Sequence, residues 1–435
     1  MRFHFAFLGL AVLLAQPLPL LAQAAPAPQP APPSAQPAAP AALTLAAAIQ
    51  RAFQSNPGLR AASQDIDIAR GQRIQAGKFL NPEVSYLREG QQKDRRSTTV
   101  QLDQEIELGG KRGARIASGN REIEVASADL ATYRANLRAD VVTAFFDVVA
   151  AQERLALAQS SQELAQRVSG ATARRVTAGK ISPVEETRAR VAEASTKIEL
   201  SQAANELALA RQRLGATWGN KNGVSEAVEA PPATLGAHPT KSELFVHLPG
   251  APQLARAKLE IERQRALADI ERSRRIPNLT LSVGSKRDEQ VGARQTIVGV
   301  SLPLPLFDRN QGNLLSALRR ADKARDQLLV TETNLSVELT QASLRLEAAQ
   351  GELRVLRGEI LPGAQSAYEA ATKGFELGKF NFLDVLDAQR TLTLAKTQYV
   401  RALAESHRAA ADIERVVGNV EPHGRLINPT VNPQE

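Results

Sequence analysis

Few side chains in this sequence are of the types that perform catalysis or bind metal ions. Cysteine is absent, and beyond the first 24 residues there are four histidines, at His238, His247, His407 and His423. None of them stands at ligand spacing from another histidine or a paired acid, and no phosphate-binding glycine loop appears. No serine or aspartate is accompanied by a base that would activate it. The sequence therefore predicts that the protein is not an enzyme and uses neither a cofactor nor a metal site.

Acidic side chains recur at every second position in one short segment. Between Ser97 and Leu108, the acids Asp103, Glu105 and Glu107 alternate with mostly apolar residues, so a strand here has one acidic and one apolar face. The segment 295–304 alternates in the same way, though less regularly. Such a strand is typical either of a half-buried globular sheet or of a membrane barrel with a polar lumen.

The rest of the chain favours helices. Its apolar residues are mostly Ala and Leu, and Arg, Glu and Gln are abundant, which is the composition of long helices packed side by side. Only two strand hairpins are expected, at about 79–108 and 275–304. Four strands of about ten residues cannot enclose a lumen, so a barrel would need several copies of the chain.

The same series of signals occurs twice along the chain. A first copy is predicted at 43–219 and a second at 243–419, joined by a crossover at 220–242 that is rich in Gly, Pro and Ala. Gly113 corresponds to Gly312 and Gly179 corresponds to Gly378, both at an offset of 199 residues. We infer that insertions are confined to the strand hairpins.

Each copy contains a long helix with a coiled-coil pattern. Small and apolar residues repeat with alternating steps of three and four at 141–158 and at 335–360. The first of these helices, from about 113 to 176, would measure about 95 Å. That length is too great for an ordinary globular domain and suits either a wall of packed coiled coils or a dimeric rod.

The two ends of the chain differ from the repeats. Residues 1–24 have the basic start, apolar run and small-residue cleavage site of a signal peptide, and 25–42 is a Pro/Ala-rich tether. Residues 420–435 form a C-terminal tail. Without cysteine there is no acylation site that could anchor the chain. The formal net charge of +8 is spread among acids along the helices, so nucleic acid is not expected as a partner.

Several motifs resemble those of the TolC-like outer membrane factors. They are the opening Leu43-Thr44-Leu45 with Asn56-Pro57-Gly58-Leu59, the turn at 305–313, and the segment from Gly378 to Gln389. The basic turn at 107–115 resembles the cobalt-zinc-cadmium resistance branch of that family. The resemblance implies a mainly α protomer with a small β part, three copies of which close a twelve-stranded barrel in the outer membrane of a Gram-negative bacterium. A helical tunnel would continue the barrel across the periplasm to an adaptor and an inner-membrane pump.

The resemblance also implies which residues form the channel. Asp384 and Asp387 match the acids that ring the periplasmic aperture, and by the offset of 199 Glu185 and Arg188 occupy the same places in the first copy. We expect Arg188 to pair with an acid across the hairpin tip and help to hold the aperture shut. The adaptor would contact the tips, at Gly179, Lys180, Gly378 and Lys379, and the barrel lumen would present Asp103, Glu105 and Glu107. The alternative is that all these charges are merely solvated near helix starts.

The expected function is that of an outer-membrane channel in a tripartite efflux system of the RND type. Divalent heavy-metal cations such as cobalt, zinc, cadmium or nickel are the expected substrates, with selectivity residing in the inner-membrane pump because conduction requires weak binding in the duct. A duct for drugs or other small organic compounds is one alternative. A periplasmic coiled-coil adaptor or a structural coiled-coil protein is another.

Overall fold

Long helices account for most of the part of the chain that the computed structural model describes, which is residues 42–229, 240–377, 379–380 and 382–418. The predicted signal peptide, nearly all of the tether, half of the crossover and the C-terminal tail lie outside these residues, as do Gly378, His238 and His423. Among the described helices, none combines the length and apolar composition needed to cross a bilayer.

The elements follow one another as two similar series. In order they are α1 (Leu45–Ser55), α2 (Pro57–Ala76), β1 (Glu83–Glu89), η1 (Lys93–Arg95), β2 (Ser97–Ile106), α3 (Lys111–Thr177), α4 (Pro183–Ala216), α5 (Lys241–His247), η2 (Leu248–Gly250), α6 (Pro252–Ser273), β3 (Leu279–Asp288), β4 (Ala293–Ser301), α7 (Gln311–Val355), the π-helical turn η3 (Leu356–Ile360), α8 (Leu361–Glu376) and α9 (Phe382–Val417). The fold is therefore mainly α with a small β part, as the sequence predicts. The domain boundaries proposed from the sequence stay predictions.

Local capping explains where several helices begin. The Thr44 hydroxyl accepts a hydrogen bond from the Ala47 amide at 3.3 Å, and the Asn56 side chain accepts one from the Leu59 amide at 2.7 Å. Ser182 caps α4 in the same way, followed by a proline at the first helical position. These side chains satisfy amide groups that have no partner within the helix.

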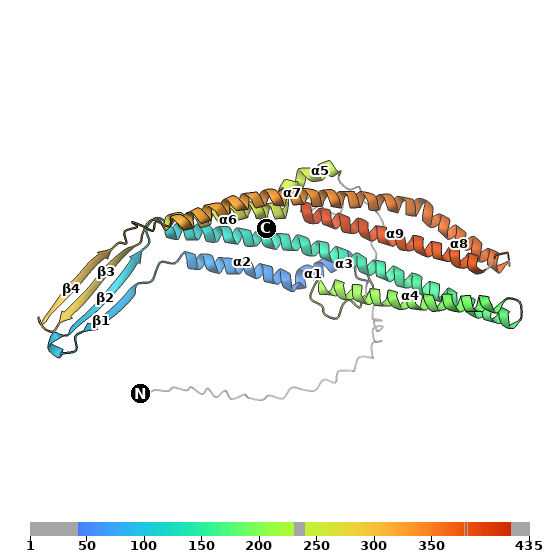
Figure 1. Ribbon diagram of the computed structural model, residues 1–435, viewed down its shortest axis with the longest axis horizontal. Helices are drawn as coiled ribbons and strands as arrows, with labels where there is room; N and C mark the ends of the chain where they lie inside the picture. The colour runs from blue at the N-terminus through green and yellow to red at the C-terminus, as the bar shows by residue number, and fades with distance from the viewer. Residues whose placement is uncertain (1–41, 230–239, 378, 381, 419–435) are drawn as a thin grey trace, which may run out of the picture. The chain divides into compact units, whose positions relative to one another are not determined.

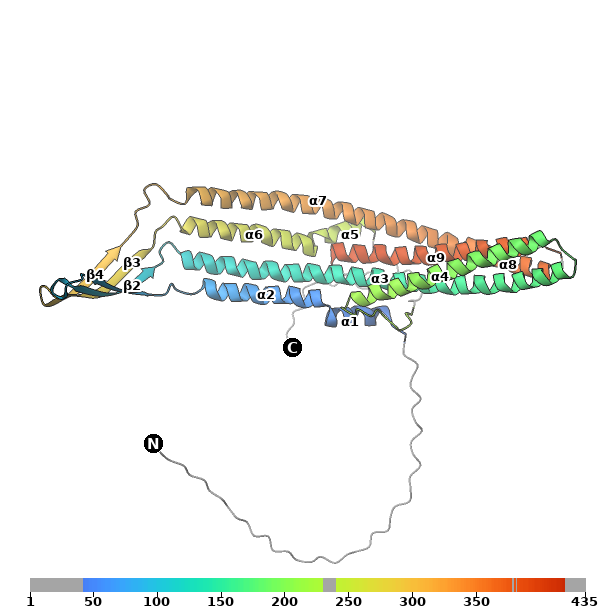
Figure 2. The same ribbon diagram turned by 60° about the horizontal axis from the view of Figure 1, so that its bottom comes forward.

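The four strands form one antiparallel sheet in the order β1-β2-β3-β4. The pairing of β2 with β3 joins the two series, with Asp103 opposite Ser282 and Leu102 opposite Val283. Figures 1 and 2 show the sheet at one end of residues 42–418 and the α3–α4 and α8–α9 connections at the other. Helix α3 runs beside α2 and then α4, while α7 runs beside α6 and then α9.

The core is a set of seams between these helices. Phe145 and Phe146 are buried where α3 packs on α1 and α4, and Leu335 and Leu339 are buried where α7 packs on α5 and α9. Helix α3 contains 67 residues, so it is about 100 Å long. The long helix predicted from about 113 to 176 is therefore present.

The predicted seam at 335–360 is correct up to Leu356 and wrong at Ile360. Residues from Leu335 to Leu356 are buried at the expected steps, but Ile360 is 41% exposed. The π turn Leu356–Ile360 adds one residue to the helix, so the seam resumes one position later, at Leu361 and Ala364. A single π turn inside an α-helix holds one extra residue while the helix continues on both sides.

This turn also corrects the inference that insertions lie only in the strand hairpins. In the middle of the long helix, before the π turn, matching buried residues of the two series stand 198 apart, as Val148 and Leu346 do, although Gly113 and Gly312 at its start stand 199 apart. Below it they stand 199 apart, as Ala165 and Ala364 do. The π turn therefore adds one residue to the second series and restores the offset that Gly113 and Gly312 have at the helix start, so the register of the two series changes within the long helix.

Candidate channel surfaces

One face of the sheet presents polar and acidic side chains. Asp103 accepts hydrogen bonds from Ser282 on β3 and, at 2.7 Å, from the Gln101 side chain. Glu105 accepts one from Asn278 at 2.6 Å, and Glu83 on β1 lies opposite Asp103. These contacts hold the carboxylates across the strands on a common surface, which we call the polar face.

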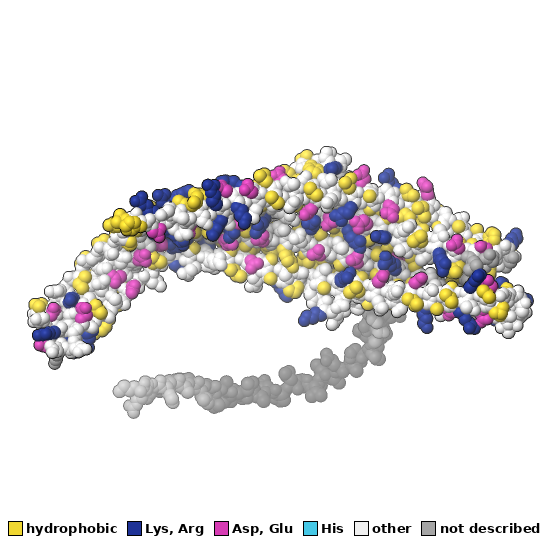
Figure 3. Space-filling view, viewed as in Figure 1, with side chains coloured by type: hydrophobic (Ala, Val, Ile, Leu, Met, Phe, Trp, Pro, Cys, Tyr) yellow, Lys and Arg dark blue, Asp and Glu magenta, His cyan; other side chains and the backbone are white. Residues whose placement is uncertain are grey.

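The other face of the sheet is apolar and exposed. Val100 and Leu102 are 47% and 46% exposed, and the apolar residues paired with them on the other strands, Tyr86, Val84 and Val283, are exposed as well. We call this surface the apolar face; its members are Val84, Tyr86, Val100, Leu102, Leu281, Val283, Val298 and Val300. Figure 3 shows hydrophobic side chains gathered where the sheet meets the helices, and Phe307 in that region is 92% exposed. A sheet that is covered on neither side needs another apolar partner on this face.

The basic turn at 107–115 fastens the sheet to the helices. Glu107 lies one residue beyond β2, and its carboxylate pairs with the Arg115 guanidinium at the start of α3, with the second contact at 2.8 Å. This hydrogen-bonded pairing holds the pKa of the Glu107 carboxyl below its ordinary value. Arg112 donates to the Gly77 carbonyl at 2.7 Å, and Lys111 contacts Asn278. The sequence indicated a turn here but not the contacts of Arg112 and Lys111, because the residues they join are 35 and 167 positions apart.

The hairpin tips bring the two series close together. Helix α3 ends at Thr177, and two residues later Gly179 has the left-handed conformation at φ 65°, followed by the exposed Lys180. In the second tip Lys379 is exposed, and its amide donates to the Gly374 carbonyl at 2.8 Å. The Arg175 guanidinium lies 5.4 Å from the ring centroid of Phe375, which joins the ends of α3 and α8. Contact of these tips with an adaptor stays a prediction.

Asp384 and Asp387 share the exposed side of the first turns of α9. The residues between them, Val385 and Leu386, are 3% and 8% exposed and point into the coiled coil. The buried Gln389 side chain donates to the Ser161 hydroxyl of α3 at 3.4 Å, which fixes the rotation of this part of α9. Both carboxylates are thus held on one surface, one helical turn apart.

Arg188 does not have the partner expected of it within this chain. Its guanidinium pairs with Glu185 at 3.1 Å, three residues earlier on the same helix, rather than with an acid across the tip. Side chains three residues apart on a helix are neighbours, so Arg188 pairs with the nearby Glu185 and not with a more distant acid. Glu185 and Arg188 therefore lie at the tip as a pair that neutralises its own charge.

A layer of ion pairs around α9 was missed in the sequence. Arg138 of α3 contacts Glu414 at 2.9 Å, and Arg408 contacts Asp147. Burial nevertheless raises the pKa of the Glu414 carboxyl, against the opposing effect of Arg138. These partners are separated by more than 250 residues, so no local spacing in the sequence predicts the ion pairs.

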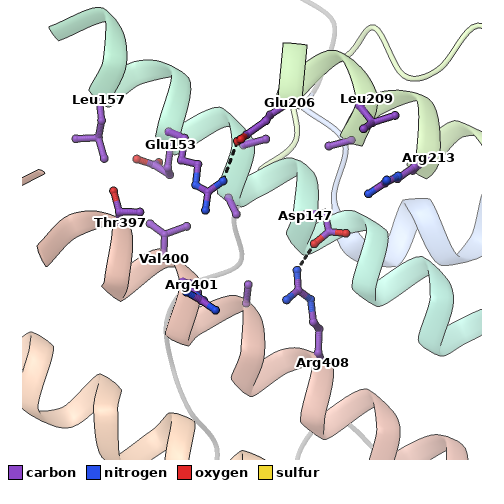
Figure 4. Close-up of a pocket in the computed structure, with 15 residues that line it drawn as sticks. Asp147, Glu153, Leu157, Glu206, Leu209, Arg213, Thr397, Val400, Arg401 and Arg408 are labelled. Atoms are coloured by element: carbon purple, nitrogen blue, oxygen red, sulfur yellow. Dashed lines mark hydrogen bonds and ion pairs between the residues drawn. The ribbon is translucent and has the colours of Figure 1, made fainter. Parts of the chain in front are cut away.

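A cavity of about 480 Å³ opens between α3, α4 and α9 beside this layer (Figure 4). Arg154 and Glu206 pair across one side of it at 2.7 Å, and Asp147 and Arg408 pair across another. Charges of both signs line the cavity and compensate one another. Within the described residues, no group of three or more His, Asp or Glu side chains is arranged to hold a metal ion.

Comparison with known proteins places these surfaces in a family. The model described as outer membrane efflux protein matches residues 48–220 and again 247–419. The chain belongs to the outer membrane efflux protein family. It is similar to the cobalt-zinc-cadmium resistance protein CzcC of Cupriavidus metallidurans, with 45% identity over 86% of this chain and 90% of CzcC. The nickel-cobalt-cadmium resistance protein NccC of Alcaligenes xylosoxydans xylosoxydans is 29% identical over 64% of this chain and 65% of its own.

Solved structures of the family agree in fold. The open state of the MtrE outer membrane channel of Neisseria gonorrhoeae superposes with a TM-score of 0.72, at 19% identity, over 88% of this chain and 91% of MtrE. The resemblance to TolC-like outer membrane factors is thereby confirmed. The chain is an outer-membrane efflux protein with a helical extension toward the periplasm.

Proposed function

We propose that three copies of this chain form the outer-membrane channel of an RND-type tripartite efflux system that exports divalent heavy-metal cations such as cobalt, zinc, cadmium or nickel. The observation that supports the substrate most is the 45% identity with a cobalt-zinc-cadmium resistance protein along nearly the whole of both chains. An adaptor at the hairpin tips and an inner-membrane pump complete the system.

The two faces of the sheet support the assembly. Each chain supplies four amphipathic strands with the acids on one face and the apolar residues on the other. Four strands leave two open edges, whereas three copies can close twelve strands with the polar face inward. The acids Asp103 and Glu105 then line the lumen, and the apolar face meets lipid.

Metal sensitivity tests the substrate. Deleting the gene in its own bacterium should lower the concentrations of zinc, cobalt and cadmium that stop growth, and restoring the intact gene should reverse this. Susceptibility to organic dyes and antibiotics should not change. If metal tolerance is unaffected while dyes become more toxic, the chain is instead a duct for organic compounds.

A further inference from the structure

Three arginines lie in a single row across the sheet, on the same side as the apolar face. The register pairs Arg88 of β1 with Thr98 of β2, Thr98 with Arg287 of β3, and Arg287 with Arg294 of β4. Directly paired residues point to the same side of a sheet, so these side chains form one band, which we call the arginine row. All three arginines are exposed.

The arginine row lies at the edge of the apolar face, next to the hairpin turns. The next row inward contains Tyr86 and Val100, and the one after it Val84 and Leu102, all exposed. From Thr98 to Ile106 along β2 the strand rises about 26 Å. Tilted by about 40°, a strand of that length rises about 20 Å, which is most of the roughly 25 Å height of the lipid-facing band of a bacterial barrel. The row therefore marks one boundary of that band.

The boundary is the outer one, if the chain is the outer-membrane channel proposed above. The hairpin turns and the arginine row are at the end of the sheet farthest from the helices, which extend into the periplasm. Figure 3 shows Lys and Arg side chains at that far end, with Asp and Glu side chains among them. The guanidinium groups then lie at the depth where the outer-leaflet lipids have their polar head groups.

We propose that the arginine row binds the phosphate groups of outer-leaflet lipids. Guanidinium is a planar fork of donors that binds phosphate oxygens in pairs, and its charge complements theirs. No ion pair joins Arg88 or Arg294 to another described residue. Arg287 pairs with Glu289 at 3.0 Å, and both side chains are exposed. An exposed ion pair contributes little free energy, so a phosphate group can replace Glu289 as the partner of Arg287. A trimer would surround the barrel with three such rows.

Lys286 provides a matched control. It is the chain neighbour of Arg287 and is paired with Gln295, the chain neighbour of Arg294, so it lies at the same depth on the polar face. A lysine in the lumen cannot reach lipid. Arg294→Gln and Lys286→Gln each remove one positive charge from the same level of the barrel, one outside and one inside.

The test counts lipids bound to the detergent-purified full-length protein by native mass spectrometry. Diphosphoryl lipid A is supplied in the micelles, and in parallel the same lipid with both phosphates removed. We expect the parent to retain the phosphorylated form about tenfold better, Arg294→Gln to weaken this preference, and the triple variant Arg88→Gln, Arg287→Gln, Arg294→Gln to lose it. Lys286→Gln should behave as the parent.

The outcomes separate this inference from the proposed function on which it rests. A parent protein that does not purify as a membrane trimer overturns both. If the trimer forms but the triple variant retains lipid A as the parent does, or the dephosphorylated lipid binds equally well, the inference alone is wrong. Inorganic phosphate at millimolar concentration should not displace the lipid; complete displacement would mean a site for free phosphate and not for a lipid.

Discussion

Asp384 and Asp387 are held on the surface of α9 by the burial of the two residues between them. In the proposed trimer they place six carboxylates at the end of the tunnel farthest from the sheet. A ring of like charges in a narrow aqueous passage concentrates cations and repels anions. Multivalent cations should bind there most strongly and obstruct the passage.

Asp384→Asn with Asp387→Asn should therefore lower the cation-over-anion permeability ratio about twofold or more and weaken block by multivalent cations, while the trimer still assembles. Reversal potentials in planar bilayers measure the ratio. Glu199→Gln, an exposed acid further along α4, is the control and should change neither property. A double variant that selects and blocks like the parent would make these aspartates ordinary surface charges.

Arg138 and Glu414 make a pH-dependent prediction. Burial raises the pKa of Glu414, so its ionised form costs stability as the pH rises above the ordinary glutamate range, and protonation at lower pH removes that cost. Arg138→Met removes the opposing charge and should cost about 2 kcal/mol at pH 8 but less at pH 5. Thermal unfolding of the purified protein at both pH values measures this.

The exposed pair Arg256 and Asp129, at 3.0 Å, serves as the comparison. Arg256→Met should cost no more than about 0.5 kcal/mol at either pH. An Arg138→Met loss that is equal at pH 5 and pH 8 would mean that the Glu414 carboxylate is not the source of the penalty.

The face on which a side chain lies could be predicted from the sequence where the period of the helix or strand alone determines it. The spacing of three placed Asp384 and Asp387 together, and alternation placed Asp103 and Glu105 together. Glu107 continues the same alternation, but the strand ends at Ile106 and Arg115 takes its carboxylate. The partner of Arg138 depends on which of several acids comes nearest in three dimensions, and no pattern of residue types specifies that. The partner of Arg188 has the spacing of three that a helix pattern indicates.

In the proposed barrel, neighbouring residues of β2 face lipid and lumen in turn. Leu102→Arg puts a charge on the apolar face and should cost about 2 to 4 kcal/mol near the middle of the membrane, lowering the amount of assembled trimer. Asp103→Asn, one residue away on the polar face, should leave assembly intact. Trimer yield from the outer-membrane fraction measures both. The opposite ranking would mean that the strand faces the other way.

The long helices were predictable from their repeating steps, but the π turn was not. One inserted residue leaves both halves of the helix regular, and only the change of offset from 198 to 199 between the two series reveals it. Pro362 lies two residues beyond the π turn and cannot donate to the carbonyl of Gly358 within it, so a widened turn fits there. The insertion is therefore accommodated by a local change, without altering the packing on either side.

Deleting Gly358 together with Pro362→Ala should give an uninterrupted α-helix that keeps both halves of the seam, and assembly should survive. Deleting Gln159, at the corresponding place in α3, should instead rotate the lower seam of the first series by about 100° and abolish assembly. Yields of trimer on denaturant-free gels compare the two deletions. Loss of assembly from both would show that the π turn is required for packing.

For the whole molecule, the two similar series of elements explain why a single chain cannot close a barrel. Its two strand hairpins pair into a single sheet that still has open edges at β1 and β4. The apolar face of that sheet is exposed along its whole length. A closed ring of copies removes the edges and presents this face to lipid, which is the central claim of the proposed function.

The mass of the native assembly tests that claim most directly. The full-length protein is expressed in its own bacterium, the outer-membrane fraction is extracted with mild detergent, and the mass is measured by native mass spectrometry. We expect three chains per particle, recovered from the outer membrane. Recovery of single chains from the periplasmic fluid without detergent would contradict it.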